Sequence, residues 1–247
     1  MIRDRLRAAR LKRLLQPVTV RVFARLASTN TAAERLLAER KIAAPAVIVT
    51  SRQTAGRGRR ANQWWSDGGS LCTTFVLPAT DNPPPEQIPF RTALAVVVAL
   101  ETSMPRGVLR VKWPNDIYAG DFKLAGILCK RNGDADVIGI GINVTTNLRA
   151  APASVARHAT TVARHTRHPP TREELLIAIW EAMQREWTRD DWHSRYCELH
   201  LLNGSSIRVA CDGETIEGIC EGVAPTGHLL VRTPGRLRSI SSGTVMT

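Results

Sequence analysis

The sequence lacks any apolar run of the roughly 18 residues that a membrane-spanning helix needs, so it predicts no helical membrane protein. It contains no Gly-x-x-x-x-Gly-Lys-Ser/Thr segment, which excludes a P-loop nucleotide site. Its five cysteines form no Cys-x-x-Cys pair and have no regular spacing, so no metal site of that kind is indicated. An odd number of unpatterned cysteines is typical of reduced, mostly buried thiols, and we expect a cytoplasmic protein.

Lysine is also scarce. The chain has 5 lysines against 29 arginines, and its formal net charge is +12. A strongly basic chain attracts nucleic acid or acidic partners, so an RNA-binding function stays open at this point. The arginines are scattered with few tight runs, however, which favours a general arginine bias over a nucleic-acid footprint. The basic residues 1–16 have helical periodicity and predict a solvated or peripheral first helix.

Hydrophobic patterning divides the 247 residues into a large mixed domain and a small all-β domain. Apolar runs and turn residues predict helices at 29–40, at 90–102 and within 171–200, and strands at 19–26, 46–51, 70–77, 108–113, 123–130 and 137–144. From Gly204 onward, short alternating strands with glycine at the turns predict a small β-barrel. The expected divisions are a basic N-terminal segment at 1–27, a large domain at 28–202 and a barrel at 203–247.

The most unusual segment is QTAGRGRRANQWW, residues 53–65, in which arginines and glycines are followed by two tryptophans. Three functions are possible for this segment. Gly56-x-Gly58-x-x-Ala61 matches a loose dinucleotide-binding fingerprint, but the next residues form turns and do not begin an apolar helix. The arginines and tryptophans would also suit the phosphates and bases of RNA. The third function is closure over a small, reactive phosphate compound.

A second segment favours this third function. VKWPNDIYAGDFKLAGIL, residues 111–128, places Lys112, Asn115, Asp116 and Lys123 around a hairpin, and three of the five lysines lie in it or directly after it. A compact ammonium suits a site where a point charge meets a phosphoryl oxygen. The proline before Asn115 ends the strand, so Asn115 and Asp116 project from a strand end, where ligands usually bind. For Lys123 alone, a solvated hairpin lysine is the simpler explanation.

Together with GIGINV (residues 139–144), the two segments closely resemble the biotin protein ligase family, and the Ser28-Thr29-Asn30 turn fits the same pattern. The resemblance runs from about Ser28 to the C-terminus. It implies an α+β fold, a mixed β-sheet flanked by helices and akin to the cores of class II tRNA synthetases. It also implies a small C-terminal barrel of the Src-homology-3 type. On this basis residues 28–202 would form the catalytic domain.

The resemblance also implies roles for individual residues. Biotin would be bound by Ser28, Thr29, Gln53, Gly56, Arg57, Lys123 and Gly126. The nucleotide would be bound by Arg57, Arg59, Trp64, Asn115 and Asn143. Arg59 and Lys123 would act on carboxylate and phosphate oxygens, and Asp116 would be the base for the acceptor amine.

The implied enzyme uses ATP and magnesium to convert biotin into biotinyl-5′-adenylate and then transfers biotin to a lysine of a biotin carboxyl carrier protein. Arginines and mobile glycines would suit this anionic, water-labile intermediate. The alternatives are a lipoate–protein ligase on the same fold and a basic RNA-binding protein. We expect no membrane partner. We also expect no specific DNA, because the 27 residues before Ser28 are too few for a winged helix-turn-helix domain. A homodimer is left open.

Two positions depart from the family pattern. Ala61 stands where the family generally has glycine, which predicts a stiffer loop. Gly243-Thr244-Val245 lacks the carboxylate of the usual Gly-Glu-Val, which leaves the contribution of the barrel to the nucleotide site open.

Overall fold

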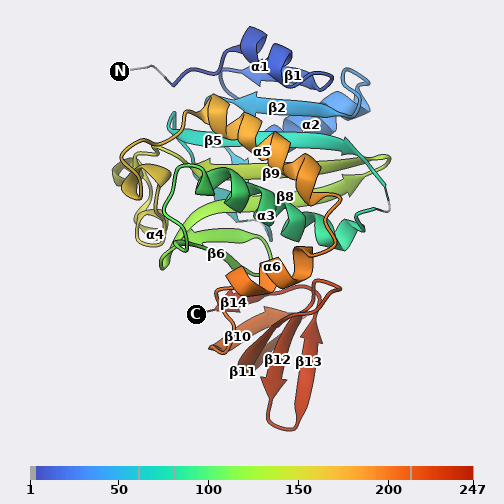
Figure 1. The fold of residues 1–247 in the computed structure, drawn as a ribbon, viewed down its shortest axis with the longest axis vertical. Helices are drawn as coiled ribbons and strands as arrows, with labels where there is room; N and C mark the ends of the chain where they lie inside the picture. The colour runs from blue at the N-terminus through green and yellow to red at the C-terminus, as the bar shows by residue number, and fades with distance from the viewer. Residues whose placement is uncertain (1–3, 61, 81, 212, 247) are drawn as a thin grey trace.

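The structure is a computed structural model that describes residues 4–60, 62–80, 82–211 and 213–246, so the prediction about Ala61 lies outside it. Its largest element is a seven-stranded sheet in the order β1-β2-β5-β9-β8-β7-β6 (Figure 1). The sheet is mixed, because β1 and β2 are parallel and the other neighbours are antiparallel. Its strands are β1 (Thr19–Phe23), β2 (Ala46–Thr50), β5 (Ser70–Pro78), β6 (Leu109–Lys112), β7 (Asp116–Ala119), β8 (Phe122–Asn132) and β9 (Ala135–Asn143).

Helices cover both faces of this sheet. One face packs against α2 (Thr29–Ala38), and the other packs against α3 (Ile88–Glu101) and α5 (Arg172–Glu186), which lie in front of the sheet in Figure 1. Successive side chains of a strand point to opposite faces. Accordingly Ile48 of β2 joins the hydrophobic cluster of α2, whereas its neighbours Val47 and Val49 join that of α3 and α5. The predicted mixed sheet with flanking helices is confirmed.

Local signals set several element ends as predicted. The hydroxyl of Ser28 accepts the N–H of Thr31 at 3.4 Å and caps α2. The β7–β8 and β8–β9 hairpins turn at Gly120 and Gly133, whose φ angles of 58° and 57° lie in the left-handed region that glycine adopts without strain. The region 152–168 contains the single-turn α4 (Ala153–Ala156).

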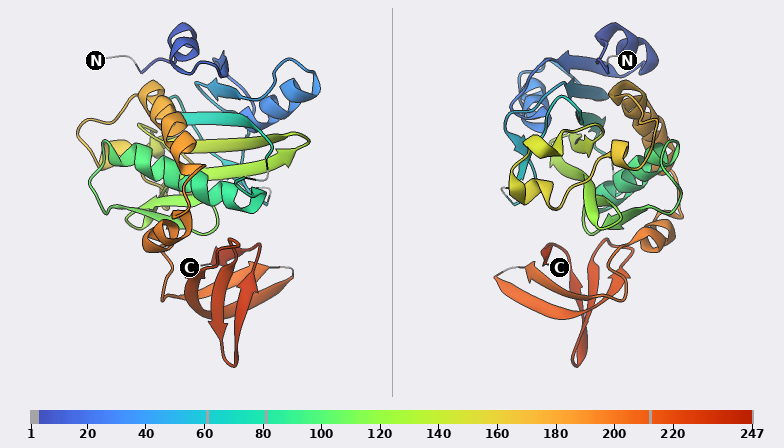
Figure 2. Two further views of the ribbon diagram at one scale, coloured as in Figure 1. Left: turned by 45° about the vertical axis from the view of Figure 1, so that its right-hand side comes forward. Right: turned by 90° about the vertical axis from the view of Figure 1, so that its left-hand side faces the viewer.

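The C-terminal part is a separate antiparallel sheet in the order β13-β12-β11-β10-β14, which extends away from the larger sheet (Figure 2). α6 (Trp192–Leu199) leads into it, and the indole Nε1 of Trp113 joins the two parts by donating to the carbonyl of Gly227 at 2.9 Å. This arrangement agrees with the expected Src-homology-3-like barrel. Its strands are β10 (Ser206–Cys211), β11 (Glu214–Val223), β12 (Leu229–Thr233), β13 (Arg236–Ile240) and β14 (Thr244–Met246).

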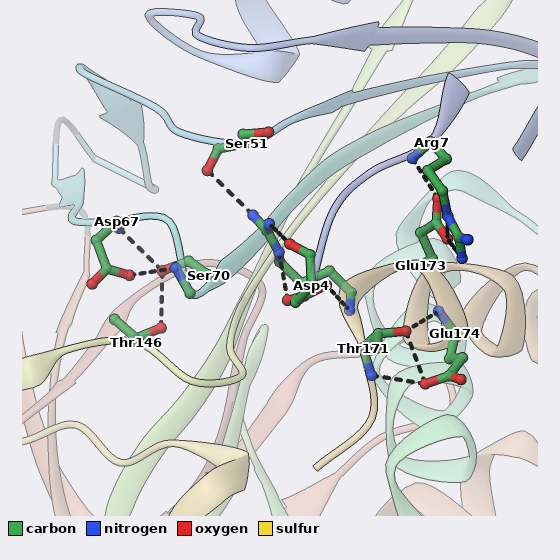
Figure 3. Close-up of polar contacts among 11 residues, drawn as sticks. Asp4, Arg7, Ser51, Asp67, Ser70, Thr146, Thr171, Glu173 and Glu174 are labelled. Atoms are coloured by element: carbon green, nitrogen blue, oxygen red, sulfur yellow. Dashed lines mark hydrogen bonds and ion pairs between the residues drawn. The ribbon is translucent and has the colours of Figure 1, made fainter. Parts of the chain in front are cut away.

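The N-terminal helix is peripheral, as predicted. Most residues of α1 (Ala8–Leu14) are exposed, but Leu11 and the following Leu15 are fully buried and anchor it. Arg7 Nη2 lies 2.7 Å from Glu173 Oε2 at the start of α5, in a cluster of polar contacts with the N-terminal segment (Figure 3). Leucines four residues apart share one face of a helix, and this spacing was the available signal for burial.

Candidate active site

A cavity of about 240 Å³ lies on the α2 face of the seven-stranded sheet. Its floor is bare because Gly126 of β8 and Gly141 of β9 are directly paired and neither has a side chain. The indole of Trp64 lies over both: a Cβ atom would be 2.5 Å from Trp64 Cε2 if built on Gly141 and 3.4 Å from Trp64 Cζ3 if built on Gly126. A Cβ on Gly139 would collide with Asn30. Any larger residue at these positions would fill the site.

One wall of the cavity is the arginine loop, residues 53–65. Its two short strands, β3 (Gly56–Arg57) and β4 (Gln63–Trp64), were not predicted. The strands pair as a small hairpin whose tip is closed by a 2.7 Å hydrogen bond from the N–H of Gly58 to the carbonyl of Asn62. At the base, Gln53 Oε1 accepts both the N–H of Thr29 at 2.7 Å and its hydroxyl at 3.1 Å. The loop is therefore tied to the start of α2.

The β7–β8 hairpin contributes a lysine and a carboxylate to the same cavity. Lys123 Nζ lies 2.7 Å from Asp116 Oδ2 and 5.9 Å from the centroid of the Trp64 ring. The other oxygen, Asp116 Oδ1, is buried and has no hydrogen-bond partner in the described part of the chain. Asn115 donates from Nδ2 to the carbonyl of Ile127, which holds the β6–β7 turn against β8. Lys123 is thus a partly buried, ion-paired lysine and not a solvated one.

The cavity is cationic. Burial, and then the charge of Arg60, lowers the pKa of Arg59 although Asp116 opposes them. The Arg59 guanidinium has no hydrogen bond or ion pair with the residues that the structure describes. Burial also lowers the pKa of Lys112, and it raises the pKa of Tyr118 to about 12. The described lining contains one carboxylate, Asp116. It contains five cations: Arg57, Arg59, Arg60, Lys112 and Lys123. The site therefore favours an anionic ligand.

The structure brings ten of the twelve residues singled out in the sequence into this lining: Ser28, Thr29, Gln53, Arg57, Arg59, Trp64, Asn115, Asp116, Lys123 and Gly126. Gly56 and Asn143 lie outside the lining that the structure describes. Gly56 pairs with β4, and a Cβ built on Gly56 would be 2.7 Å from Gln53 Nε2. Asn143 is buried at the end of β9 opposite Ser70, and its nucleotide role stays a prediction.

No role was predicted for some other lining residues. Gly139 and Gly141 could have been predicted to line the site from their spacing, because residues two apart in a strand share one face and two glycines leave that face without side chains. Asn30 donates to the carbonyl of Leu128 at 3.1 Å and accepts the hydroxyl of Thr74 at 2.6 Å. Arg60 and the segment 243–245 of the barrel also line the cavity, so the barrel, whose contribution the sequence left open, borders the site.

A second cavity of about 540 Å³ adjoins the first. Arg59, Trp113 and Asn115 line both. The second is bounded by Phe90 of α3 and by His228 of the barrel. Arg59 therefore lies between two spaces, and a ligand with two parts could extend from one into the other.

Within the described ranges, no group of three or more His, Cys, Asp or Glu side chains is placed to hold a metal ion. Nor does that part of the chain contain a helix that is long and apolar enough to cross a membrane. Cys72, Cys211 and Cys220 are buried, as predicted for mostly buried thiols, and Cys129 and Cys197 are partly buried.

The chain is similar to known proteins and to two family models. The model of the biotin/lipoate A/B protein ligase family matches residues 22–147, and the model of the biotin protein ligase C terminal domain matches residues 204–246. The biotin--[acetyl-CoA-carboxylase] ligase of Paracoccus denitrificans is 31% identical over 242 residues, covering 91% of this chain and 98% of that protein. The enzyme of the same name from Mycobacterium tuberculosis is 29% identical, covering 81% of this chain and 78% of that protein.

A solved structure is also similar. The biotin protein ligase from Aquifex aeolicus in complex with biotin and ATP superposes with a TM-score of 0.80 at 26% identity. The match covers 92% of this chain and 97% of that chain, so it includes both the large sheet and the C-terminal sheet.

Proposed function

The chain belongs to the biotin/lipoate A/B protein ligase family, and from this premise we propose that it is an ATP-dependent ligase that attaches biotin to the carrier domain of a carboxylase. The single observation that carries the proposal is the cationic cavity over a bare glycine floor. There Lys123 is paired to Asp116 at 2.7 Å, and Arg59 has no partner within the described residues. Such a site binds an anion, because the protein itself does not neutralise all the positive charges of the lining.

In the first proposed step, a biotin carboxylate oxygen attacks the α-phosphorus of ATP, and pyrophosphate leaves. Two anions must approach each other, so the protein has to position them and neutralise charge, and it needs no covalent nucleophile. Lys123 and Arg59 supply that charge from β8 and from the arginine loop. Biotin would lie beside the Trp64 indole, which covers Gly126 and Gly141, and the backbone of Gly126 would line its pocket.

In the second proposed step, the ε-amine of the carrier lysine attacks the carbonyl carbon of the mixed anhydride, and AMP leaves. The amine must lose a proton as the amide forms. Asp116 is the proposed base: its Oδ2 is held by Lys123, while its Oδ1 has no partner among the described residues and is the atom that would accept the proton.

Magnesium enters this proposal with ATP. Mg²⁺ keeps several waters and binds through one or two carboxylates together with substrate phosphates. A lining with Asp116 as its one described carboxylate fits an ion carried by the nucleotide better than a resident metal. We place the reaction in the cytoplasm, where thiols such as the five cysteines of this chain stay reduced.

The test is incubation of the purified chain with biotin, MgATP and a carrier-domain fragment, followed by intact-mass measurement. We expect one added biotinyl group, and none when ATP is omitted or when the acceptor lysine of the carrier is replaced by arginine. Lipoate replaces biotin in a parallel reaction. No added mass, or addition of lipoate alone, would contradict the proposal.

A further inference from the structure

Arg60 connects the arginine loop to the C-terminal sheet. Its Nη1 donates to the carbonyl of Ala210 at 3.1 Å and to the hydroxyl of Thr244 at 3.2 Å, and its Nη2 donates to the hydroxyl of Ser242 at 3.3 Å. The acceptors lie 150 to 184 residues further along the chain. The forked guanidinium of arginine suits such a contact, because it presents several donors in a fixed geometry.

The backbone at the loop tip is held in an uncommon conformation. Arg60 has a φ angle of 50°, in the left-handed region that residues other than glycine seldom adopt. Such a conformation persists where the surrounding structure holds it, and the contacts with the C-terminal sheet provide that support. The turn is also closed on its other side, since the N–H of Asn62 donates to the carbonyl of Arg59 at 3.0 Å. Arg59 and Arg60 therefore share one tight turn, and fixing one side chain limits the other.

The barrel edge that receives Arg60 also borders the cavity. Gly243, Thr244 and Val245 are lining residues. A Cβ on Gly243 would be 2.6 Å from Val209 Cγ1 of β10 and 3.5 Å from the ring of Trp113, so this edge packs tightly within the barrel and lies in contact with the large domain. The loop tip is thus attached to a part of the barrel that is itself held in place.

We propose that Arg60 is a positioning residue that fastens the tip of the arginine loop to β10 and the segment 242–244, so that the barrel holds Arg59 in the cavity. The proposal rests on the proposed function and adds one element to it: the barrel controls how long the adenylate stays bound. Arg60 acts through the loop and does not touch the reacting atoms.

The first experiment needs neither biotin nor ATP. Trypsin cleaves after arginine only where the chain can open, so the initial rate of cleavage at residues 57–60 of the free protein, followed by intact mass, reports loop opening. The double variant Ser242→Ala/Thr244→Val removes two acceptors and leaves every loop arginine in place. The matched control is Ser206→Ala/Thr215→Val, on exposed positions of the same sheet whose side chains have no hydrogen bond to the loop in the described part of the chain.

We expect the double variant to be cleaved about three to ten times faster than the wild type and the control to be cleaved at the wild-type rate, with equal melting temperatures. Thr244→Glu should slow cleavage, because a carboxylate forms a stronger hydrogen bond with a guanidinium than a hydroxyl does. Equal rates for the double variant and the wild type would overturn the proposal. So would a Thr244→Glu variant that is cleaved as fast as the wild type.

The second experiment measures the reaction with Arg60→Ala, and with Arg52→Ala, directly before the same loop, as a charge-matched control. Arg60→Ala should release biotinyl-adenylate about three to ten times faster than the wild type and Arg52→Ala. Unchanged release would overturn the proposal. If the wild type makes no adenylate, the proposed function fails, and the cleavage experiment still decides whether Arg60 fastens the loop.

Discussion

At the scale of single residues, Lys123 and Arg59 share one cavity but differ in their surroundings. Lys123 is paired with Asp116 at 2.7 Å, whereas Arg59 has no such partner among the described residues and has a pKa lowered first of all by burial. A paired, fixed ammonium is suited to charge that develops in the transition state. An unpaired guanidinium on a loop is suited to holding an anion that is already bound.

Replacing Lys123 should therefore affect the chemical step. We expect Lys123→Ala to slow adenylation by about 10²–10³-fold, the scale of losing one preorganised donor. Folding should change little, because the side chain is partly exposed at a hairpin. ATP–pyrophosphate exchange measures the effect, and Lys130→Ala, an exposed lysine of the same strand paired with Glu34, is the control. An unchanged exchange rate would show that Lys123 has only a structural role.

Replacing Arg59 should affect retention of the intermediate. A charged hydrogen bond contributes about 1.5–3 kcal/mol, so Arg59→Gly should release biotinyl-adenylate roughly ten- to a hundredfold faster. The released anhydride would acylate lysines of serum albumin in a reaction with biotin and MgATP but without carrier. We expect albumin labelling with Arg59→Gly and none with the wild type or with Lys123→Ala. Retention as tight as in the wild type would mean that the loop is not the lid.

At the scale of elements, the start of α5 is the point where the N-terminal segment joins the large domain (Figure 3). The hydroxyl of Thr171 caps the helix together with Glu174. Asp4 accepts the N–H of Arg172 at 3.0 Å, where a helix favours a negative charge. The Arg172 side chain donates in turn to the carbonyl of Ser51 at 3.3 Å, next to the base of the arginine loop. The N-terminal segment thus supports the strand from which the loop begins.

Glu173, at 1% exposure, should make this junction sensitive to acid. Burial alone would raise its pKa, but hydrogen bonds from Arg7 and the charges of Arg7 and Arg10 outweigh burial and lower it. A lowered pKa stabilises the fold above the unfolded value of about 4.3, and this contribution disappears as the pH falls through the folded value. We expect Glu173→Gln to cost about 1–3 kcal/mol at pH 7 and progressively less below about pH 4.3.

Urea unfolding of the wild type and Glu173→Gln across this pH range measures the difference. Glu181→Gln, on an exposed position of the same helix, is the control and should have no such pH-dependent effect. A stability difference that stays constant down to pH 3 would show that the Glu173 charge is not the cause.

At the scale of the whole molecule, the cavity depends on two sheets that are far apart in the chain. We expect a chain ending at Leu202 to fold its seven-stranded sheet, because all seven strands precede that residue. It should lose most of the overall biotinylation, since it lacks the acceptors of Arg60, the lining segment 243–245 and the carbonyl that binds Trp113. Hydrogen exchange reports the folded sheet, and intact mass of the carrier reports the reaction. Full activity would show that the barrel is dispensable.

Much of this protein follows from local sequence. Strands and helices were predicted from apolar periodicity, because a side chain's face within an element depends only on residue spacing. The hairpin after Trp113 was predicted from its segment, and most of the cavity lining was predicted from that hairpin and the arginine loop. These features are local, so a short segment contains all the information they need.

The sequence by itself thus determined most of the elements, the family and most of the charged residues of the site. Only the tertiary structure decided that α1 packs through Leu11, that Trp64 lies over paired glycines, and that Arg60 reaches the barrel. The physical reason is the same in each case. These contacts join residues that are distant in the chain, and which of them meet is decided by the packing and hydrogen bonding of the complete fold, not by the pattern of either segment alone.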